Sequence, residues 1–198
     1  MPDQPPDAED PRTKLLDAVI ADAGEHGIAD TSLRQLAARI GTSHRMLIHH
    51  FGSKDELLVA VVHEVERRQR DALADLAGTT TTPDELGWAF WERLADPALA
   101  PLERLFFEVY AQALLDRPWA GAFLDGIVDE WIGPVAELLG ATGLPPDRAR
   151  ARARLGVAVS RGLLLDLLAT GDRAGVDAAM AEFAALLGPV GPTATPSA

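Results

Sequence analysis

The chain has 198 residues, a formal net charge of −12 and no cysteine, which excludes disulfides, thiolate metal sites and cysteine nucleophiles. Aromatic residues make up only 6% of a chain rich in alanine and leucine, so the composition favours an all-α fold. No apolar run approaches the roughly 20 residues that span a bilayer, and the acidic, proline-rich N-terminus does not resemble a secretory signal. We therefore expect a cytoplasmic protein.

Nine blocks have apolar residues at helical spacing and are separated by proline, glycine or threonine. The seventh block contains Gly133 and Pro134, where we expect a kink or an interruption. Both ends of the chain, 1–11 and 189–198, lack apolar periodicity and are predicted to be disordered. The predicted helices span residues 12–26, 33–40, 43–50, 54–76, 83–94, 102–115, 120–139, 146–170 and 176–187.

The second and third predicted helices are short, amphipathic and joined by a turn that contains glycine. Two helices connected in this way pack at a steep angle, and the second one projects in a shape that fits a DNA major groove. We expect His44, Arg45 and His49 to face outward, while Leu47 and Phe51 anchor the helix to the core. The pattern predicts a helix-turn-helix.

Charge is unevenly distributed along the chain. Residues 11–54 carry six basic and four acidic side chains, whereas residues 55–198 carry twelve basic and twenty-two acidic ones. The N-terminal part is therefore the one suited to bind phosphates. Lys54 lies in the first turn of a predicted helix, where the helix dipole disfavours a cation, and a nearby phosphate explains its presence. The alternative is that the two short helices are core-packing helices with a polar outer face.

From Arg12 to Leu58 the sequence resembles the DNA-binding region of the TetR family of bacterial transcriptional regulators. It departs from the family pattern at Arg45, Met46 and Ile48, the last of which replaces a tyrosine that commonly touches a DNA phosphate. Ile48 must either pack inward or meet a thymine methyl group, and Arg45 can bind guanine in a bidentate way. The matching residues are Gly27, Thr31, Ser32, Leu36, Ala37, Gly41, Ser43, Leu47, His50, Phe51, Ser53, Lys54, Asp55, Glu56 and Leu57.

The resemblance implies a nine-helix architecture in which a three-helix DNA-binding domain, 12–53, precedes a helical effector-binding and dimerisation domain, 54–188. It further implies a homodimer that binds palindromic double-stranded operator DNA, most often as a repressor, and a small molecule that releases it. The candidate DNA-binding residues are Thr31, Ser32, Arg34, Thr42, Ser43, His44, Arg45, Met46, Ile48, His49 and Lys54.

Nine of the eleven aromatic residues lie between Trp88 and Trp131, in the helices that enclose the effector pocket in the family. An aromatic lining with a few polar groups is typical of small-molecule sites. We therefore expect an apolar or aromatic effector, with ordinary core packing as the alternative for each single residue. The candidate ligand-binding residues are Trp88, Trp91, Phe106, Phe107, Tyr110, Trp119, Phe123 and Trp131.

The last two predicted helices are rich in small residues that allow close helix packing. Such faces suit a four-helix dimer interface, and packing within the subunit is the alternative. The arginines between 148 and 154 wind around their helix as solvated charge, some of it expected to pair with acids of the partner subunit. The candidate interface residues are Leu155, Val159, Gly162, Leu163, Met180, Phe183 and Leu187.

Two functions remain as alternatives to a ligand-responsive repressor. One is a regulator, repressor or activator, whose pocket is vestigial and whose activity a partner protein controls. The other is an all-helical enzyme, although the sequence has no nucleophile elbow, phosphate-binding loop or dinucleotide fingerprint. The histidines have no metal-ligand spacing, so we expect no metal and no cofactor. Conceivable acid–base residues for an enzyme are Glu92, Glu108, Asp125 and Asp129.

Overall fold

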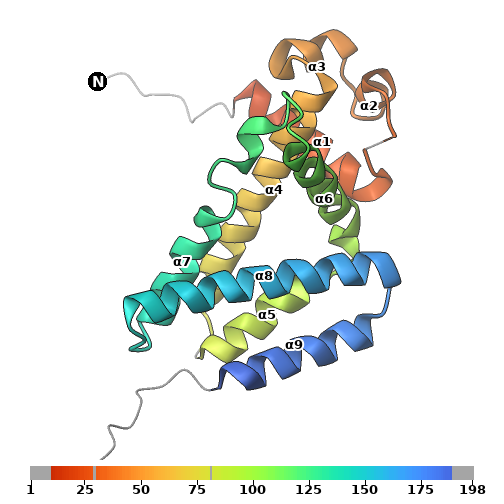
Figure 1. Ribbon diagram of the computed structural model, residues 1–198. Coiled ribbons are helices and arrows are strands. Elements are labelled where there is room, and N and C mark those ends of the chain that lie inside the picture. The colour runs from red at the N-terminus through yellow and green to blue at the C-terminus, as the bar shows by residue number, and fades with distance from the viewer. Residues whose placement is uncertain (1–9, 29, 81, 189–198) are drawn as a thin grey trace, which may run out of the picture. The chain divides into compact units, whose positions relative to one another are not determined.

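The structure, a computed structural model, describes residues 10–28, 30–80 and 82–188. Within these residues the chain forms nine α-helices and two short 3₁₀ helices, without a β-strand (Figure 1), which confirms the predicted all-α fold. None of the helices in these ranges is long and apolar enough to cross a membrane. The segments predicted to be disordered are 1–11 and 189–198, and of these, residues 1–9 and 189–198 lie outside the described residues.

The helices agree with the predicted blocks except at a few ends and in the seventh block. Two 3₁₀ helices, η1 and η2, precede α6 and α7 along the chain. The elements are α1 (Pro11–His26), α2 (Leu33–Arg39), α3 (His44–Phe51), α4 (Lys54–Ala77), α5 (Pro83–Leu94), η1 (Pro97–Leu99), α6 (Ala100–Leu114), η2 (Gly121–Leu124), α7 (Asp129–Gly140), α8 (Pro146–Thr170) and α9 (Arg173–Leu187).

Side-chain caps explain two of the differences in helix ends. The expected disordered arm to residue 11 is too long, because α1 begins at Pro11 and the Asp10 carboxylate accepts a hydrogen bond from the Arg12 backbone N–H at 3.3 Å. Similarly, α9 begins at Arg173 and not at residue 176. There the Asp172 carboxylate accepts from the Gly175 N–H at 2.9 Å.

The predicted helix 120–139 is wrong in its first half. Residues 121–124 form η2, and the backbone between η2 and α7 is irregular, with Gly126 at a left-handed φ of 82°. A helix cannot continue through that conformation, so the chain is interrupted there and not at Gly133 and Pro134. Pro134 instead lies inside α7, which continues past it to Gly140.

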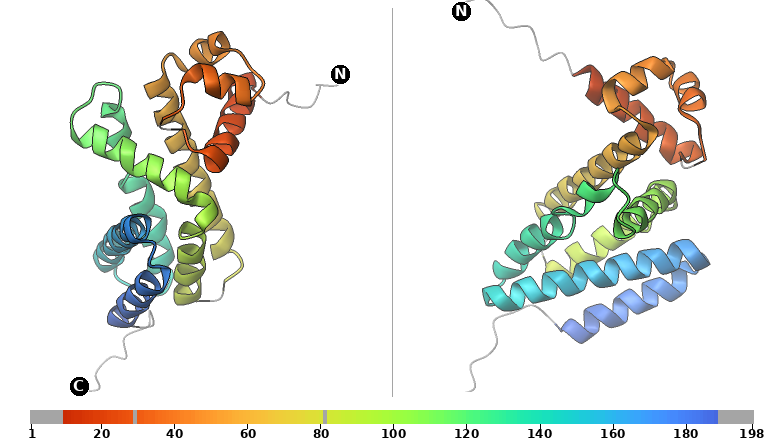
Figure 2. Two further views of the ribbon diagram at one scale, coloured as in Figure 1. Left: turned by 90° about the vertical axis from the view of Figure 1, so that its right-hand side faces the viewer. Right: turned by 45° about the horizontal axis from the view of Figure 1, so that its top comes forward.

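The chain divides into two compact units, and α4 contributes to both. Unit 1 comprises Met1–Glu66 and Ala98–Phe123, and unit 2 comprises Arg67–Pro97 and Leu124–Ala198. In unit 1, α1 packs against α2 and α6, and α2 packs against α3. In unit 2, α7 packs against α8, and α8 and α9 lie side by side in opposite directions (Figures 1 and 2). The first part of α4 thus belongs to the same unit as the predicted helix-turn-helix.

Each unit has its own buried apolar residues. Leu73, Leu86 and Trp131 form a core cluster in unit 2, and partly buried side chains of α4, α5, α7 and α8 pack against it. Unit 1 buries apolar residues from each of its main helices. They include Val19, Leu36, Leu47, Leu57, Val61, Val109 and Phe123, each with 1% exposure or less.

Candidate nucleic-acid interface

The first helix of the helix-turn-helix, α2, begins at a reciprocal cap. The Ser32 hydroxyl accepts a hydrogen bond from the Gln35 backbone N–H at 3.3 Å, and the Gln35 side-chain oxygen accepts from the Ser32 N–H at 3.1 Å. Such a capping box satisfies two N–H groups that the first turn leaves free. It fixes the start of α2 at Leu33, as the sequence predicts.

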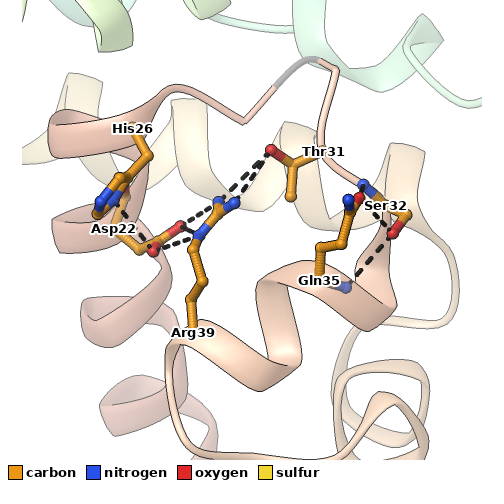
Figure 3. Close-up of polar contacts among 6 residues, drawn as sticks. All are labelled: Asp22, His26, Thr31, Ser32, Gln35 and Arg39. Carbon is orange, nitrogen blue, oxygen red and sulfur yellow. Dashed lines mark hydrogen bonds and ion pairs between the residues drawn. The ribbon is translucent and has the colours of Figure 1, made fainter.

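A bidentate ion pair connects the end of α2 to α1 (Figure 3). The Arg39 Nε donates to Oδ1 and Oδ2 of Asp22 at 2.7 and 3.0 Å, and Nη2 donates to Oδ2 at 2.6 Å. The same guanidinium lies 3.4 to 3.5 Å from the Thr31 hydroxyl, just before α2 begins. The Arg39 side chain, at the end of α2, therefore connects this end to α1 and to the residue just before the start of α2.

The Asp22 carboxylate is buried, with a side-chain exposure of 7%, and its charge depends on this pair. The hydrogen bonds from Arg39 lower the pKa of Asp22 below its usual value of 3.8, although burial acts in the opposite direction. His26 Nδ1 lies 3.3 Å from the same carboxylate and contributes further to this lowering. Asp22 is thus held in its charged form.

The turn between α2 and α3 has the geometry that its glycine permits. Gly41 has a φ of 70°, in the left-handed region that residues with a side chain rarely adopt. The Thr42 N–H donates to the Ala37 carbonyl at 2.9 Å, and the Ser43 hydroxyl then accepts from the Met46 N–H at 3.2 Å to cap α3. Both ends of the turn are therefore fixed by hydrogen bonds.

Helix α3 is anchored on one side and exposed on the other. Leu47 and Phe51 are buried, and the Arg12 guanidinium lies 5.0 Å from the centre of the Phe51 ring. His44, Arg45 and His49 are exposed, as predicted from the sequence. This side of α3 can meet DNA while its apolar side keeps the helix in place.

Two apolar residues of α3 belong to its exposed side. Met46 is 42% exposed and Ile48 is 37% exposed. Ile48 therefore packs partly against the protein and keeps part of its side chain at the surface, where contact with a thymine methyl group stays a prediction. Met46 and Ile48 thus add apolar groups to the exposed surface of α3.

The start of α4 completes the arrangement. Gly52 has a φ of 81°, and the Ser53 hydroxyl accepts a hydrogen bond from the Glu56 N–H at 3.1 Å. Lys54 is partly exposed in the first turn of α4, where backbone N–H groups also favour a nearby anion. The remaining candidates on α2 and in the turn, Arg34 and Thr42, are exposed and half-buried respectively.

The predicted ligand-binding aromatics fall into the two units. In unit 1 the centre of the Phe106 ring lies 5.2 Å from the ring centre of Phe107, 5.6 Å from that of Tyr110 and 6.0 Å from that of Phe123. His63 also contacts the Phe123 ring at 5.3 Å. The remaining candidate of this unit, Trp119, is half-buried. Unit 1 therefore contains an aromatic cluster centred on Phe106.

The three tryptophan candidates of unit 2 have different surroundings. Trp91 is buried, and its indole N–H donates to Asp177 of α9 at 2.7 Å, which is a structural contact. Trp88 is 38% exposed, and its N–H donates to Glu92 on the same helix at 3.1 Å. Only Trp131 lies beside both an aromatic neighbour, Phe90 at 5.5 Å, and a cation.

The predicted interface residues differ in exposure. Leu155 is 46% exposed and Gly162 is exposed, whereas Met180 is buried at 7% and belongs to the core of unit 2. The four others, Val159, Leu163, Phe183 and Leu187, are half-buried. Two further apolar residues that were not among the candidates are also exposed, namely Leu165 on α8 at 51% and Leu186 on α9 at 85%.

Part of the arginine run on α8 has partners within its own chain. Arg150 and Arg154 both lie near Asp129 of α7, at 3.2 and 3.7 Å, and Arg152 donates to the Leu187 carbonyl at the end of α9 at 2.7 Å. Pairing with acids of a partner subunit is therefore not needed to explain these three residues. These contacts connect α8 to α7 and to the end of α9.

Comparison with protein families gives a match over the region just described. Residues 15–61 match the family described as "Bacterial regulatory proteins, tetR family". The HTH-type transcriptional regulator BetI of Brucella anthropi is 35% identical over 74 residues, which are 37% of this chain and 38% of that protein. The chain thus matches less than two fifths of the length of this curated relative.

Solved structures resemble a larger part of the chain. A TetR-family transcriptional regulator from Pectobacterium atrosepticum has a TM-score of 0.69 at 21% identity, covering 89% of this chain and 91% of its own. A protein from Saccharomonospora viridis in complex with choline has a TM-score of 0.62 at 18% identity, covering 86% and 92%. These similarities extend the shared fold to most of the described helices.

Proposed function

We propose that this chain is a transcriptional regulator of the TetR family, whose model residues 15–61 match, and that it binds operator DNA through α2 and α3. The observation that carries the proposal is the anchored helix α3, which buries Leu47 and Phe51 and exposes His44, Arg45 and His49. Members of the matched family are regulators and not enzymes. The acidic residues considered for acid–base catalysis therefore need no catalytic role.

We propose that the DNA-binding form is a homodimer on a palindromic operator. A single helix-turn-helix reads only a few base pairs, and two copies gain specificity by binding half-sites about one helical turn, roughly 34 Å, apart. The exposed apolar residues Leu155, Leu165 and Leu186, together with the exposed Gly162, support pairing through α8 and α9.

We further propose that a small molecule releases the repressor from DNA. Support comes from the aromatic residues of both units and from α4, a continuous helix of 24 residues, about 36 Å long, that contributes to both. A ligand that displaces the C-terminal part of α4 would also move the part that carries Lys54. The structural neighbour in complex with choline is a precedent for a ligand in this fold.

The experiment is selection of binding sites from a pool of random double-stranded DNA with the full-length protein. We expect enrichment of an inverted repeat whose half-sites are about one helical turn, or a multiple of it, apart. An exposed arginine outside the helix-turn-helix gives a matched control, and Arg117→Ala should select the same sequence. Failure to enrich any sequence contradicts the DNA-binding proposal, and a single half-site contradicts the dimer.

A further inference from the structure

We propose that the side chains around Arg70 and Trp131 bind an aromatic or apolar effector that carries a carboxylate or carbonyl oxygen. This inference rests on the proposed ligand response and names the chemistry of its ligand. Arg70 lies on the C-terminal part of α4, and Trp131 lies on α7, both in unit 2. The oxygen of the ligand would accept a hydrogen bond from Nη1 of Arg70.

The first observation is a buried donor that has no acceptor. Arg70 Nη2 donates to Glu130 Oε2 at 2.8 Å, but Nη1 is buried and makes no hydrogen bond within the described residues. A buried N–H of a charged group is rarely left unpaired in native proteins, because leaving it so is unfavourable. A ligand oxygen that reaches Nη1 would therefore gain a strong, charge-assisted hydrogen bond.

The second observation is the apolar surroundings of Trp131, the ring that lies next to the Arg70 guanidinium. Trp131 belongs to a buried cluster with Leu73 and Leu86, and Phe90 lies 5.5 Å from the Trp131 ring. Four helices of unit 2 contribute to this cluster and its surroundings. A few polar groups set into an apolar, aromatic wall are typical of sites for small molecules.

The surroundings also favour an anionic or neutral ligand over a cation. The Arg70 guanidinium carbon lies 5.9 Å from the centre of the Trp131 ring, so a protein cation already occupies the neighbourhood of that ring. Glu130 compensates the positive charge of Arg70, and its side chain is 46% exposed. A quaternary ammonium would meet the guanidinium instead of a free aromatic face. We therefore expect this site to differ from one that binds choline.

The Arg70 side chain is 20% exposed, so part of it lies at the surface of the protein. Movement of this flexible side chain would let a ligand approach Nη1. Because Arg70 is part of α4, a ligand bound to it acts directly on the helix that also carries Lys54. The site thus combines recognition of a ligand oxygen with a route by which binding affects the DNA-binding helices.

Three probes with one ring system test the ligand class: 1-naphthoate, 1-naphthamide and 1-naphthylmethylammonium. We expect calorimetry on the full-length protein to show saturable binding of the naphthoate, weaker binding of the amide and no binding of the ammonium compound or of choline. Tighter binding of either cation overturns the proposal. Absence of naphthoate binding up to millimolar concentration also overturns it.

Two substitutions locate the site. Arg70→Gln should weaken naphthoate at least about tenfold, whereas Arg67→Gln, at an exposed arginine on the same helix, should leave its affinity unchanged. Glu130→Gln should keep or increase naphthoate affinity, because it removes a competing carboxylate from Arg70. A merely structural Arg70–Glu130 pair predicts the opposite for Glu130→Gln, namely weaker binding. If Arg70→Gln does not fold, Glu130→Gln alone decides.

Operator binding, measured separately, distinguishes this inference from the proposed function. Naphthoate that binds through Arg70 without changing DNA affinity supports the site and contradicts ligand-controlled DNA binding. Release of DNA by another compound, with no naphthoate binding, contradicts the site and leaves the ligand-responsive regulator in place.

Discussion

Arg39 binds both carboxylate oxygens of Asp22, with donor–acceptor distances from 2.6 to 3.0 Å. The two residues are 17 positions apart, and their contact joins the end of α2 to the middle of α1. A partly buried ion pair therefore contributes to the position of the helix-turn-helix on its supporting helix. Its removal should affect both the stability of the protein and the binding of DNA.

Asp22→Asn should lower the free energy of unfolding by about 1–2 kcal/mol, because hydrogen bonds to a charged group are lost while the partly exposed Arg39 can still be hydrated. Urea unfolding at neutral pH measures this change. The control is Glu25→Gln, at an exposed carboxylate on the same helix, which should leave stability nearly unchanged. Equal effects of the two substitutions would mean that the ion pair contributes nothing specific.

The same pair predicts a pH dependence. Because Arg39 holds the pKa of Asp22 below 3.8, the folded state prefers the charged carboxylate more than the unfolded state does. The stability that Asp22 contributes is therefore present above about pH 4 and is lost as pH falls through its lowered pKa. The difference in unfolding free energy between wild type and Asp22→Asn should be fully present near pH 5 and shrink as pH falls below 3.8. A difference that does not change with pH would contradict this account.

Gly162→Glu should convert the proposed dimer into a monomer without unfolding it. Gly162 is exposed on α8, and among the described residues nothing beyond its own stretch of helix backbone lies within 4 Å of an added Cβ, so the side chain fits the subunit. A charge buried in a dimer interface without a partner is strongly unfavourable. Sedimentation velocity at micromolar concentration provides the test. The control is Gly87→Glu, at an exposed glycine of α5 with equally open space, which should remain dimeric.

Coupling between effector and operator must be reciprocal. If a ligand weakens operator binding by a factor that typically lies between about 5 and 150, saturating operator DNA must weaken binding of that ligand by the same factor. Calorimetric titration of the ligand with and without operator gives the factor for ligand binding. Operator binding measured with and without ligand gives the factor for DNA binding, and the two must agree. A ligand of the aromatic region whose affinity does not change with saturating operator would exclude induction by that ligand. It would favour the regulator controlled by a partner protein.

Local signals explain why the helix-turn-helix could be predicted from the sequence. The caps at Ser32 and Ser43, the glycine at the turn and the buried positions of Leu47 and Phe51 all lie within twenty residues, and each has a local cause. The start of α7 was mispredicted because apolar periodicity alone does not reveal the left-handed Gly126.

Contacts between residues far apart in the sequence could not be predicted from comparable local signals. Asp22 and Arg39 each look like ordinary surface charges in the sequence, and Arg70 looks like one of three arginines on a solvated helix face. Their importance comes from the packing of α1 on α2 and from the contact between Arg70 and Glu130 on α7. Likewise, only the structure separates Trp91, bonded to Asp177, from Trp131, which lies beside Arg70.

We propose that α3 reads DNA bases while the start of α4 binds the phosphate backbone. The most direct measurement is the ratio of operator affinity to non-specific DNA affinity, by fluorescence anisotropy, for Arg45→Ala, Lys54→Ala and the control Arg117→Ala. Arg45→Ala should reduce this ratio by about 1–3 kcal/mol, equivalent to roughly 5- to 150-fold. Lys54→Ala should weaken both affinities equally and reduce the salt dependence by about one phosphate contact. An unchanged ratio for Arg45→Ala would contradict base recognition by α3.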